Sequence, residues 1–212
     1  RSSVQTKVTD FMAAGRPIVA TAVGGIPEAL TADKEGLLVR PRDPAALAAA
    51  IETLLRDPVL AKKLGLEFLM FEPMSIEREM ASTINDTKEL LQKVNSNSMI
   101  PVYLCLDVDH GSNISSDPRD HDPYAWLKEL GSFSPVVHIK QSFKDKGGHW
   151  PFTSKYNRRG IIHPQKVIRT LEESGAGHVV LCLELSHRER YPAENRVLSD
   201  LKESVIYWKK FL

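Results

Sequence analysis

The sequence predicts an α/β fold, a parallel sheet of about six βα units covered by helices on both faces. Two observations carry this prediction. Short apolar runs rich in β-branched residues recur along the 212 residues, and stretches with helical spacing of apolar side chains separate them. The composition, 42% hydrophobic and 26% charged, is that of an ordinary globular chain, which excludes a fibrous or disordered one.

The first 65 residues predict two Rossmann-like βα units. Two Asp-Pro pairs, at 43–44 and 57–58, are typical of helix starts, and Gly65 is typical of a helix end. In chain order, the expected elements are a strand at 17–22, a helical turn at 26–30, a strand at 37–39, and helices at 43–56 and 57–65.

The rest of the chain predicts a second part with four further βα units. All seven histidines lie after residue 65, so we divide the chain into parts 1–65 and 66–212 and expect the chemistry in the second. Ser-Asn-Ser at 96–98 and Gly-Gly at 147–148 are expected to mark loops. The expected strands are 67–71, 102–108, 135–139 and 178–185, and the expected helices are 83–94, 123–130, 164–174 and 196–211.

The net charge indicates which partners to exclude, and the cysteines indicate the cellular compartment. The formal net charge is +1, so we expect no nucleic acid and no membrane as partner. No apolar stretch approaches the ~20 residues of a membrane span, and the N-terminal residues lack the apolar core of a signal peptide. Cys105 and Cys182 lie inside apolar runs and are expected to be buried and reduced, which favours a cytoplasmic protein.

Polar side chains follow each expected strand of the second part. They are Glu72, Asp107 with His110, His138, and Glu184. Because sites in parallel α/β folds assemble at the carboxyl ends of the strands, we expect these groups to lie together. Other polar groups, among them Asp109 and His187, are expected to be loop or surface residues.

These residue types indicate a metal site. Three carboxylates and an imidazole suit Mn²⁺, Mg²⁺ or Co²⁺ better than a structural zinc site built on thiolates. A divalent ion held this way can chelate a ketone oxygen and a neighbouring hydroxyl of a sugar and stabilise the enediolate left when a C–H proton is removed. Two carboxylates beside that carbon can share the proton transfers.

Two segments of the first part resemble the C-terminal nucleotide-sugar-binding domain of GT-B glycosyltransferases of family 4. They are FMAAGRPIVATAVGGIPEAL and EGLLVRPRDPAALAAAIETLLRDPVLAKKLG. In that family an acidic residue before the MAAG segment contacts the nucleotide ribose, and the position here is Asp10, where glutamate is usual. The resemblance implies that a complete enzyme would need further strands and a second domain.

The second part resembles the xylose isomerase-like TIM barrels of sugar isomerases and epimerases, in LEFLMFEPMSIERE, VYLCLDVDHGS, SPVVHIKQS, HWPFTSKYNRRGII and VVLCLELSHRER. The resemblance implies the last four βα units of the barrel, with HWPF and SHRER closest to the branch acting on short ketose phosphates such as tetrulose phosphates. His110 would contact a substrate oxygen, and Lys144 would bind substrate where ketose epimerases often have arginine. The implied metal ligands are Glu72, Asp107, His138 and Glu184, and the acid/base pair is Glu72 and Glu184.

The two resemblances together indicate a chimera in which a half-barrel follows a glycosyltransferase-like segment. The strands could form an open twisted sheet, an incomplete barrel, or a barrel completed by a second copy in a homo-oligomer. Three hypotheses stay open. The chain is a metal-dependent isomerase or epimerase of a small sugar or sugar phosphate, weak or inactive because half the barrel is missing; it is a non-catalytic scaffold, natural or engineered; or it is a glycosyltransferase remnant.

Overall fold

The computed structural model describes residues 18–30, 36–63, 65–74, 81–109, 115–144, 146–187 and 194–212. The chain divides into two compact units. One comprises residues 1–69 and 93–102, and the other comprises residues 70–92 and 103–212. Among the described helices, none combines the length and the apolar character needed to cross a bilayer.

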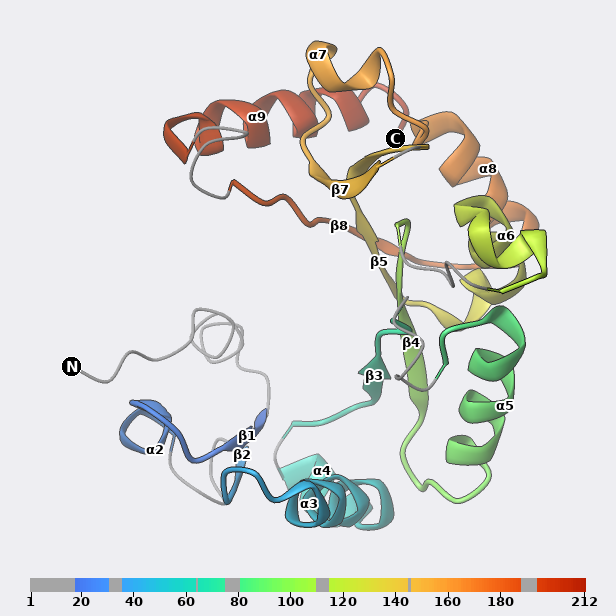
Figure 1. Ribbon diagram of the computed structural model, residues 1–212. Coiled ribbons are helices and arrows are strands. Elements are labelled where there is room, and N and C mark those ends of the chain that lie inside the picture. The colour runs from blue at the N-terminus through green and yellow to red at the C-terminus, as the bar shows by residue number, and fades with distance from the viewer. Residues whose placement is uncertain are drawn as a thin grey trace. The chain divides into compact units, whose positions relative to one another are not determined.

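The first unit contains a small parallel sheet with three helices (Figure 1). Its core consists of Ile18, Ile26 and Leu30. The expected strands and helices of the first 65 residues are all present among the described residues. They are β1 (Ile18–Thr21), α2 (Ile26–Ala29), β2 (Gly36–Val39), α3 (Pro44–Arg56) and α4 (Pro58–Lys63).

Short polar residues and one glycine fix these elements locally. The Asp43 carboxylate accepts a hydrogen bond from the backbone N–H of Ala46 at 2.8 Å and so caps α3. Asp57 accepts from the first turn of α4 in the same way. A Cβ at Gly36 would lie 2.0 Å from the carbonyl oxygen of Ile18, so the pairing of β1 with β2 requires glycine there.

The main sheet has four strands in the order β3-β4-β5-β8, and the structure confirms the expected α/β class with a parallel sheet. The pairs β4/β5 and β5/β8 are parallel, and β5 pairs with β4 from Val136 to His138 and with β8 from Val136 to Ile139. The strands and main helices are β3 (Leu69–Phe71), α5 (Ile84–Asn95), β4 (Val102–Asp107), α6 (Pro123–Leu130), β5 (Val136–Ile139), α8 (Pro164–Glu173), β8 (Val180–Leu183) and α9 (Val197–Trp208).

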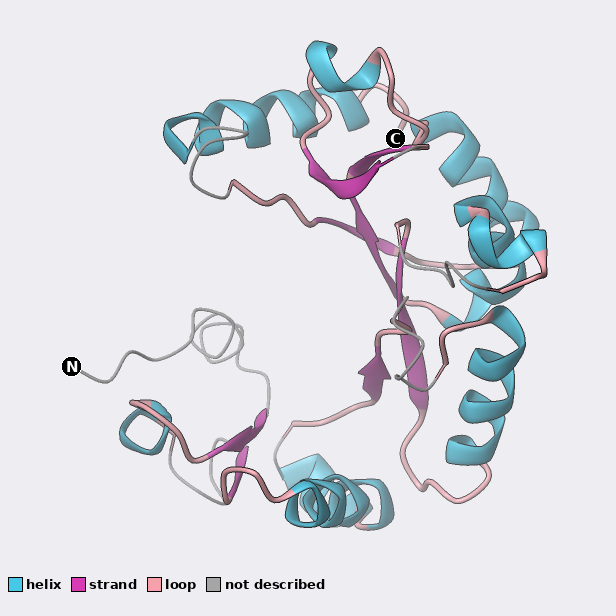
Figure 2. Cartoon of the chain, viewed as in Figure 1, coloured by secondary structure: helices cyan, strands magenta, loops and turns pink. Residues whose placement is uncertain are grey.

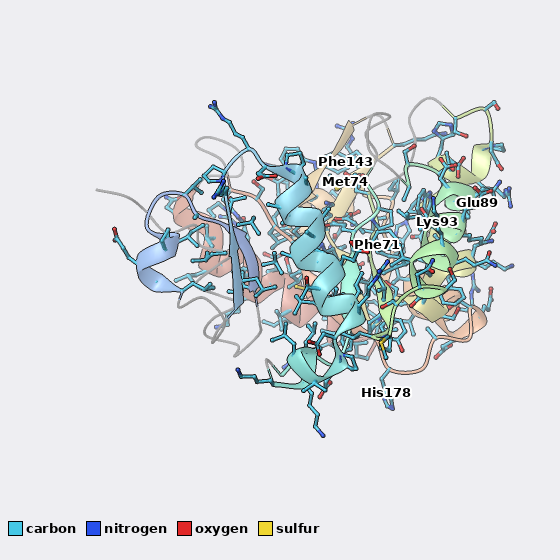
Figure 3. The ribbon with its side chains drawn as sticks, turned by 90° about the horizontal axis from the view of Figure 1, so that it is seen from below. Phe71, Met74, Glu89, Lys93, Phe143 and His178 are labelled. Carbon is cyan, nitrogen blue, oxygen red and sulfur yellow. The ribbon has the colours of Figure 1, made fainter. Side chains whose placement is uncertain are left out.

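One face of this sheet packs against helices to form the main core. Alternate strand residues supply it, because successive side chains of a strand point to opposite faces. Leu104 and Leu106 of β4 and Val137 and Ile139 of β5 are at most 2% exposed. Helices α5, α6 and α8 run along this side (Figure 2), and Phe71, labelled in Figure 3, packs against the same cluster.

The other face of the sheet is less covered than the sequence predicts. In β8 the side chains alternate between exposed and half-buried, and Val180 is 63% exposed. Cys182 is also exposed, so its predicted burial is wrong, whereas Cys105 is buried as predicted. The reason is position, because β8 is the last strand in the sheet order and its Cys182 side chain points away from the helix-covered face.

An antiparallel hairpin that the sequence does not predict follows β5. It consists of β6 (Gln141–Phe143) and β7 (Lys146–Trp150), and α7 (Ser154–Asn157) comes next. Gly147 and Gly148 lie inside β7, so the prediction of a loop there is wrong. The glycines serve close contact instead, since a Cβ at Gly147 would lie 2.8 Å from Oδ2 of Asp109. The loop predicted at 96–98 is confirmed directly after α5.

Candidate metal centre

The carboxyl ends of the four main strands bring Glu72, Asp107, His138 and Glu184 to one place. Glu72 directly follows β3, Asp107 ends β4, His138 lies in β5 and Glu184 directly follows β8. The register pairs Asp107 with His138, and His138 with Cys182, two residues before Glu184. Residues two apart share a strand face, so all these side chains point to the same side of the sheet.

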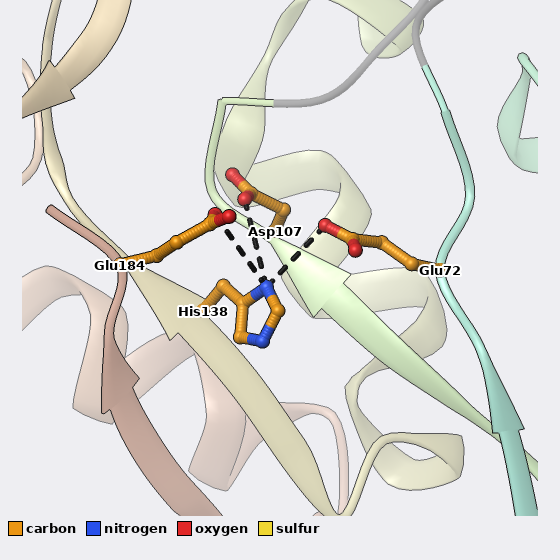
Figure 4. A group of neighbouring side chains, drawn as sticks. All are labelled: Glu72, Asp107, His138 and Glu184. Atoms are coloured by element: carbon orange, nitrogen blue, oxygen red, sulfur yellow. Dashed lines mark hydrogen bonds and ion pairs between the residues drawn. The ribbon is translucent and has the colours of Figure 1, made fainter. Parts of the chain in front are cut away.

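The four side chains form a tight cluster around one imidazole nitrogen (Figure 4). One ligand atom from each of the four residues lies within 4.8 Å of the others. Nδ1 of His138 is 3.3 Å from Oε1 of Glu72, 3.6 Å from Oε2 of Glu184 and 3.9 Å from Oδ2 of Asp107. The two glutamates approach from opposite sides of the histidine ring (Figure 4).

A buried lysine completes the cluster. Lys140 is 0% exposed, and its Nζ donates to Oδ2 of Asp107 at 2.6 Å and to Oε2 of Glu184 at 3.1 Å. Its third contact is with Nε2 of His149 at 2.9 Å. The ammonium group therefore has two carboxylate acceptors and a close contact with an imidazole nitrogen.

These contacts shift the pKa values of two cluster members. A hydrogen bond with Sγ of Cys105 and another with Glu72 raise the pKa of His138 to about 11, against the opposing effect of burial. Burial raises the pKa of Glu184, but hydrogen bonding with Asp107 and the charge of Lys140 outweigh it and lower that pKa to about 2. Near neutral pH the cluster without a metal thus holds an ionised Glu184 and a protonated His138.

The donor set fits a divalent cation. Three carboxylate oxygens and one imidazole nitrogen are the ligand types that Mn²⁺ and related ions accept. Glu72, Asp107 and Glu184 carry three negative charges and Lys140 one positive charge, which leaves a formal charge of −2 when His138 is neutral. A divalent ion would neutralise that charge.

A carboxylate next to the cluster holds the hairpin in place. Asp109 accepts hydrogen bonds from the hydroxyl of Ser142 in β6 and from the N–H of Gly148 in β7, the latter at 2.8 Å. Its own N–H donates to Oδ1 of Asp107 at 2.7 Å. Asp109 therefore links both strands of the hairpin to the site. It lies in a loop as predicted, but it also has this structural role.

The remaining site predictions have different outcomes. Lys144 is exposed in the turn between β6 and β7. His110 lies outside the described residues, so its predicted substrate contact stays a prediction. His187 lies in a loop, as expected, but not at the surface, because its side chain is 4% exposed and its Nε2 lies 3.0 Å from Oδ2 of the buried Asp200. His178, at the other end of β8, is exposed and points outward (Figure 3).

Three residues that contact the cluster were not predicted from the sequence: Lys140, His149 and Cys105. The place of Lys140 could have been predicted, because it lies two residues after His138 and so shares its strand face. The places of His149 and Cys105 could not, since their contacts depend on the hairpin and on the register of β4 with β5.

Comparison with known structures agrees with the α/β fold. The chain superposes with a TM-score of 0.62 on a crystal structure from Rhodospirillum rubrum with a provisional assignment as a xylose isomerase. The two are 22% identical, and the match covers 82% of this chain and 59% of the other. The likeness shows the fold.

The chain has curated relatives of two different kinds. It is 43% identical over 145 residues to the D-erythrulose 1-phosphate 3-epimerase of Brucella abortus, and this match covers 68% of this chain and 47% of that enzyme. It therefore spans about half the length of that enzyme.

The N-terminal residues match a different family. The family described as glycosyl transferases group 1 matches residues 1–57. The D-inositol 3-phosphate glycosyltransferase of Streptomyces avermitilis is 42% identical over 56 residues, which cover 26% of this chain and 12% of that enzyme. The predicted double resemblance is confirmed, and the chain is chimeric in sequence.

Proposed function

We propose that this chain carries the catalytic half of a divalent-metal-dependent sugar-phosphate epimerase or isomerase, with a tetrulose phosphate as the preferred class of substrate. The observation that carries the proposal is the convergence of Glu72, Asp107, His138 and Glu184 at the ends of four strands. Homology to an enzyme named for D-erythrulose 1-phosphate supports the choice of substrate class. In this proposal residues 1–65 form a glycosyltransferase-like segment and residues 66–212 the half-barrel.

The four side chains would hold Mn²⁺, Mg²⁺ or Co²⁺. A divalent ion bound there would polarise the ketone of a sugar and stabilise the negative charge that develops when a neighbouring C–H proton leaves. Asp107 and His138 would serve as ligands alone, since their side chains are 0% and 20% exposed and so less accessible to a substrate than the two glutamates.

Glu72 and Glu184 would move the proton. Both carboxylates are partly exposed, with side chains 28% and 30% accessible, so a substrate can reach them. They lie on opposite sides of His138 (Figure 4), which suits removal of a proton from one face of a carbon and its return to the other. The low pKa of Glu184 keeps its carboxylate ionised at neutral pH.

Turnover by this chain alone should be weak. The chain spans 47% of the epimerase it matches, and the rest of that enzyme would supply the other wall of the pocket. A catalytic group misplaced by ~1 Å can cost ~10²-fold in rate. We include in the proposal the predicted substrate contacts of His110 and Lys144, and the possibility that a second copy completes the barrel.

Exchange of solvent deuterium into D-erythrulose 1-phosphate, followed by NMR with Mn²⁺ present, tests the proposal. Incorporation at the carbon beside the ketone, abolished by EDTA, supports an epimerase or isomerase. Metal binding without any exchange supports the non-catalytic scaffold instead. Absence of metal binding overturns both the site and the proposed reaction.

A further inference from the structure

Lys140 is a cation inside the cluster, and its side chain is completely buried. Its Nζ donates to Oδ2 of Asp107 and to Oε2 of Glu184, and it lies 2.9 Å from Nε2 of His149. Because the amine is buried behind these contacts, we expect Lys140 to act through the two carboxylates that it contacts.

The contacts of Lys140 join the proposed metal ligands directly. Two of its three acceptors, Asp107 and Glu184, are among the four candidate ligands. The lysine thus links two distant parts of the chain. Asp107, at the end of β4, lies 33 residues before it, and Glu184, just after β8, lies 44 residues after it. It also cancels one of the three negative charges of the donor set.

We propose that Lys140 is a positioning residue that sets the charge of the metal site and so makes it selective for divalent over trivalent cations. With the lysine, the donor set carries a formal −2, and a divalent ion leaves the site neutral. Without it, the same ligands would carry −3 and favour a trivalent ion. Nε2 of His149 lies 2.9 Å from Nζ, and this contact helps to fix the orientation of the amine. The inference rests on the metal site of the proposed function and deepens it.

The magnitude follows from Coulomb's law. One unit of charge a few ångströms from an ion, at an effective dielectric constant of about 20, changes affinity by at least about tenfold for each unit of charge on the ion. A trivalent ion therefore gains from loss of the lysine more than a divalent ion does. The ratio of the two affinities therefore depends on the charge of residue 140. If the lysine had only a structural role, its loss would weaken the binding of both ions by the same factor.

The test is a calorimetric titration of metal-free protein with Mn²⁺ and separately with Tb³⁺. Lys140→Met removes the charge, Lys140→Gln removes it while keeping hydrogen-bond donors, and Lys140→Arg keeps it. Lys128→Met, which removes an exposed lysine of α6, controls for the change in net charge of the whole protein. The quantity compared is the ratio of the Mn²⁺ to the Tb³⁺ dissociation constant.

We expect this ratio to rise at least about tenfold in Lys140→Met and Lys140→Gln, and to stay unchanged in Lys140→Arg and Lys128→Met. If Lys140→Met fails to fold, the ratio measured for Lys140→Gln tests the inference. An unchanged ratio in the neutral variants, with both ions weakened equally, overturns the inference while leaving the proposed metal site standing. Absence of Mn²⁺ binding to the unaltered protein overturns the inference and the proposed function together.

Discussion

Nζ of Lys140 lies 2.6 Å from Oδ2 of Asp107, and the side chains of both residues are completely buried. Each therefore provides the counter-charge that makes burial of the other tolerable. The pair sits at the point where β4 and β5 end side by side, so it joins the framework of the sheet to the cluster that would bind a metal.

Removing the lysine should destabilise the metal-free protein. Lys140→Met leaves the buried carboxylate of Asp107 without its cation, and breaking a buried pair in this way costs about 3–5 kcal/mol. Chemical denaturation in EDTA would show a lower free energy of unfolding than for Lys128→Met. Addition of Mn²⁺ should recover part of the loss, and a variant as stable as the unaltered protein would contradict the pairing.

A divalent metal should stabilise the fold. A ligand that binds the native state alone adds about 2.7 kcal/mol at a concentration one hundred times its Kd. We expect Mn²⁺, Co²⁺ or Mg²⁺ to raise the Tm and EDTA to lower it. The rise should vanish in His138→Ala, which removes the ligand at the centre of the cluster. Identical melting curves with all three metals and with EDTA would contradict a metal site.

Both glutamates, Glu72 and Glu184, should be essential for proton exchange. Glu72→Gln and Glu184→Gln each remove a group that can accept a proton, and loss of a general acid or base typically costs ~10²–10⁴-fold. Deuterium incorporation into a ketose phosphate, measured by NMR, is the readout. Glu67→Gln, an exposed glutamate before β3, is the matched control and should leave the rate unchanged. Undiminished exchange in one glutamine variant would remove that residue from the mechanism.

Metal affinity should rise with pH. In the metal-free protein a hydrogen bond with Cys105 and another with Glu72 raise the pKa of His138 to about 11, so Nδ1 is protonated at neutral pH and must lose its proton to bind a metal. The stability that this proton gives the metal-free fold is complete below the ordinary pKa of ~6.5 and is lost as pH rises through about 11.

Calorimetry in buffers of different ionisation enthalpy measures the protons released on binding. We expect close to one proton per metal at pH 7.5, and less in Cys105→Ala, where the first cause of the raised pKa is gone. Binding without proton release would show that His138 is already neutral.

The N-terminal segment should not transfer sugars in this chain. Its match to the inositol phosphate glycosyltransferase covers 12% of that enzyme, and glycosyl transfer needs a donor pocket closed between two domains. We expect no transfer or hydrolysis of UDP-, GDP- or ADP-sugars, as measured by nucleotide release. Transfer that depends on Asp10, which lies outside the described residues, would make this segment the functional one.

The strands and the clustering of four polar side chains at their carboxyl ends were predictable because both follow from local sequence patterns. An apolar run of four to eight residues defines a buried strand, and a polar residue at its carboxyl end joins others there in any parallel sheet. Glu72, Asp107, His138 and Glu184 follow this rule. No tertiary information was needed to place them together.

The hairpin and the exposure of Cys182 were not predictable because both depend on distant contacts. Strands β6 and β7 are held by Asp109, which lies 33 residues from Ser142 and 39 from Gly148. Without that contact the pair Gly147 and Gly148 is indistinguishable from a loop. The exposure of Cys182 depends on the place of β8 at the edge of the sheet, which the apolar run around it does not encode.

The spacing of the cluster along the chain has a consequence for folding. Glu72 and His138 are 66 residues apart and Lys140 and Glu184 are 44 apart, and the entropic cost of closing a chain loop grows with its length. Helices α6 and α8 can form from local contacts, whereas the four candidate ligands come together only when β3, β4, β5 and β8 share one sheet. We therefore expect a metal ion that needs all four groups to bind after the sheet has formed, and so to stabilise the finished fold rather than to guide its early steps.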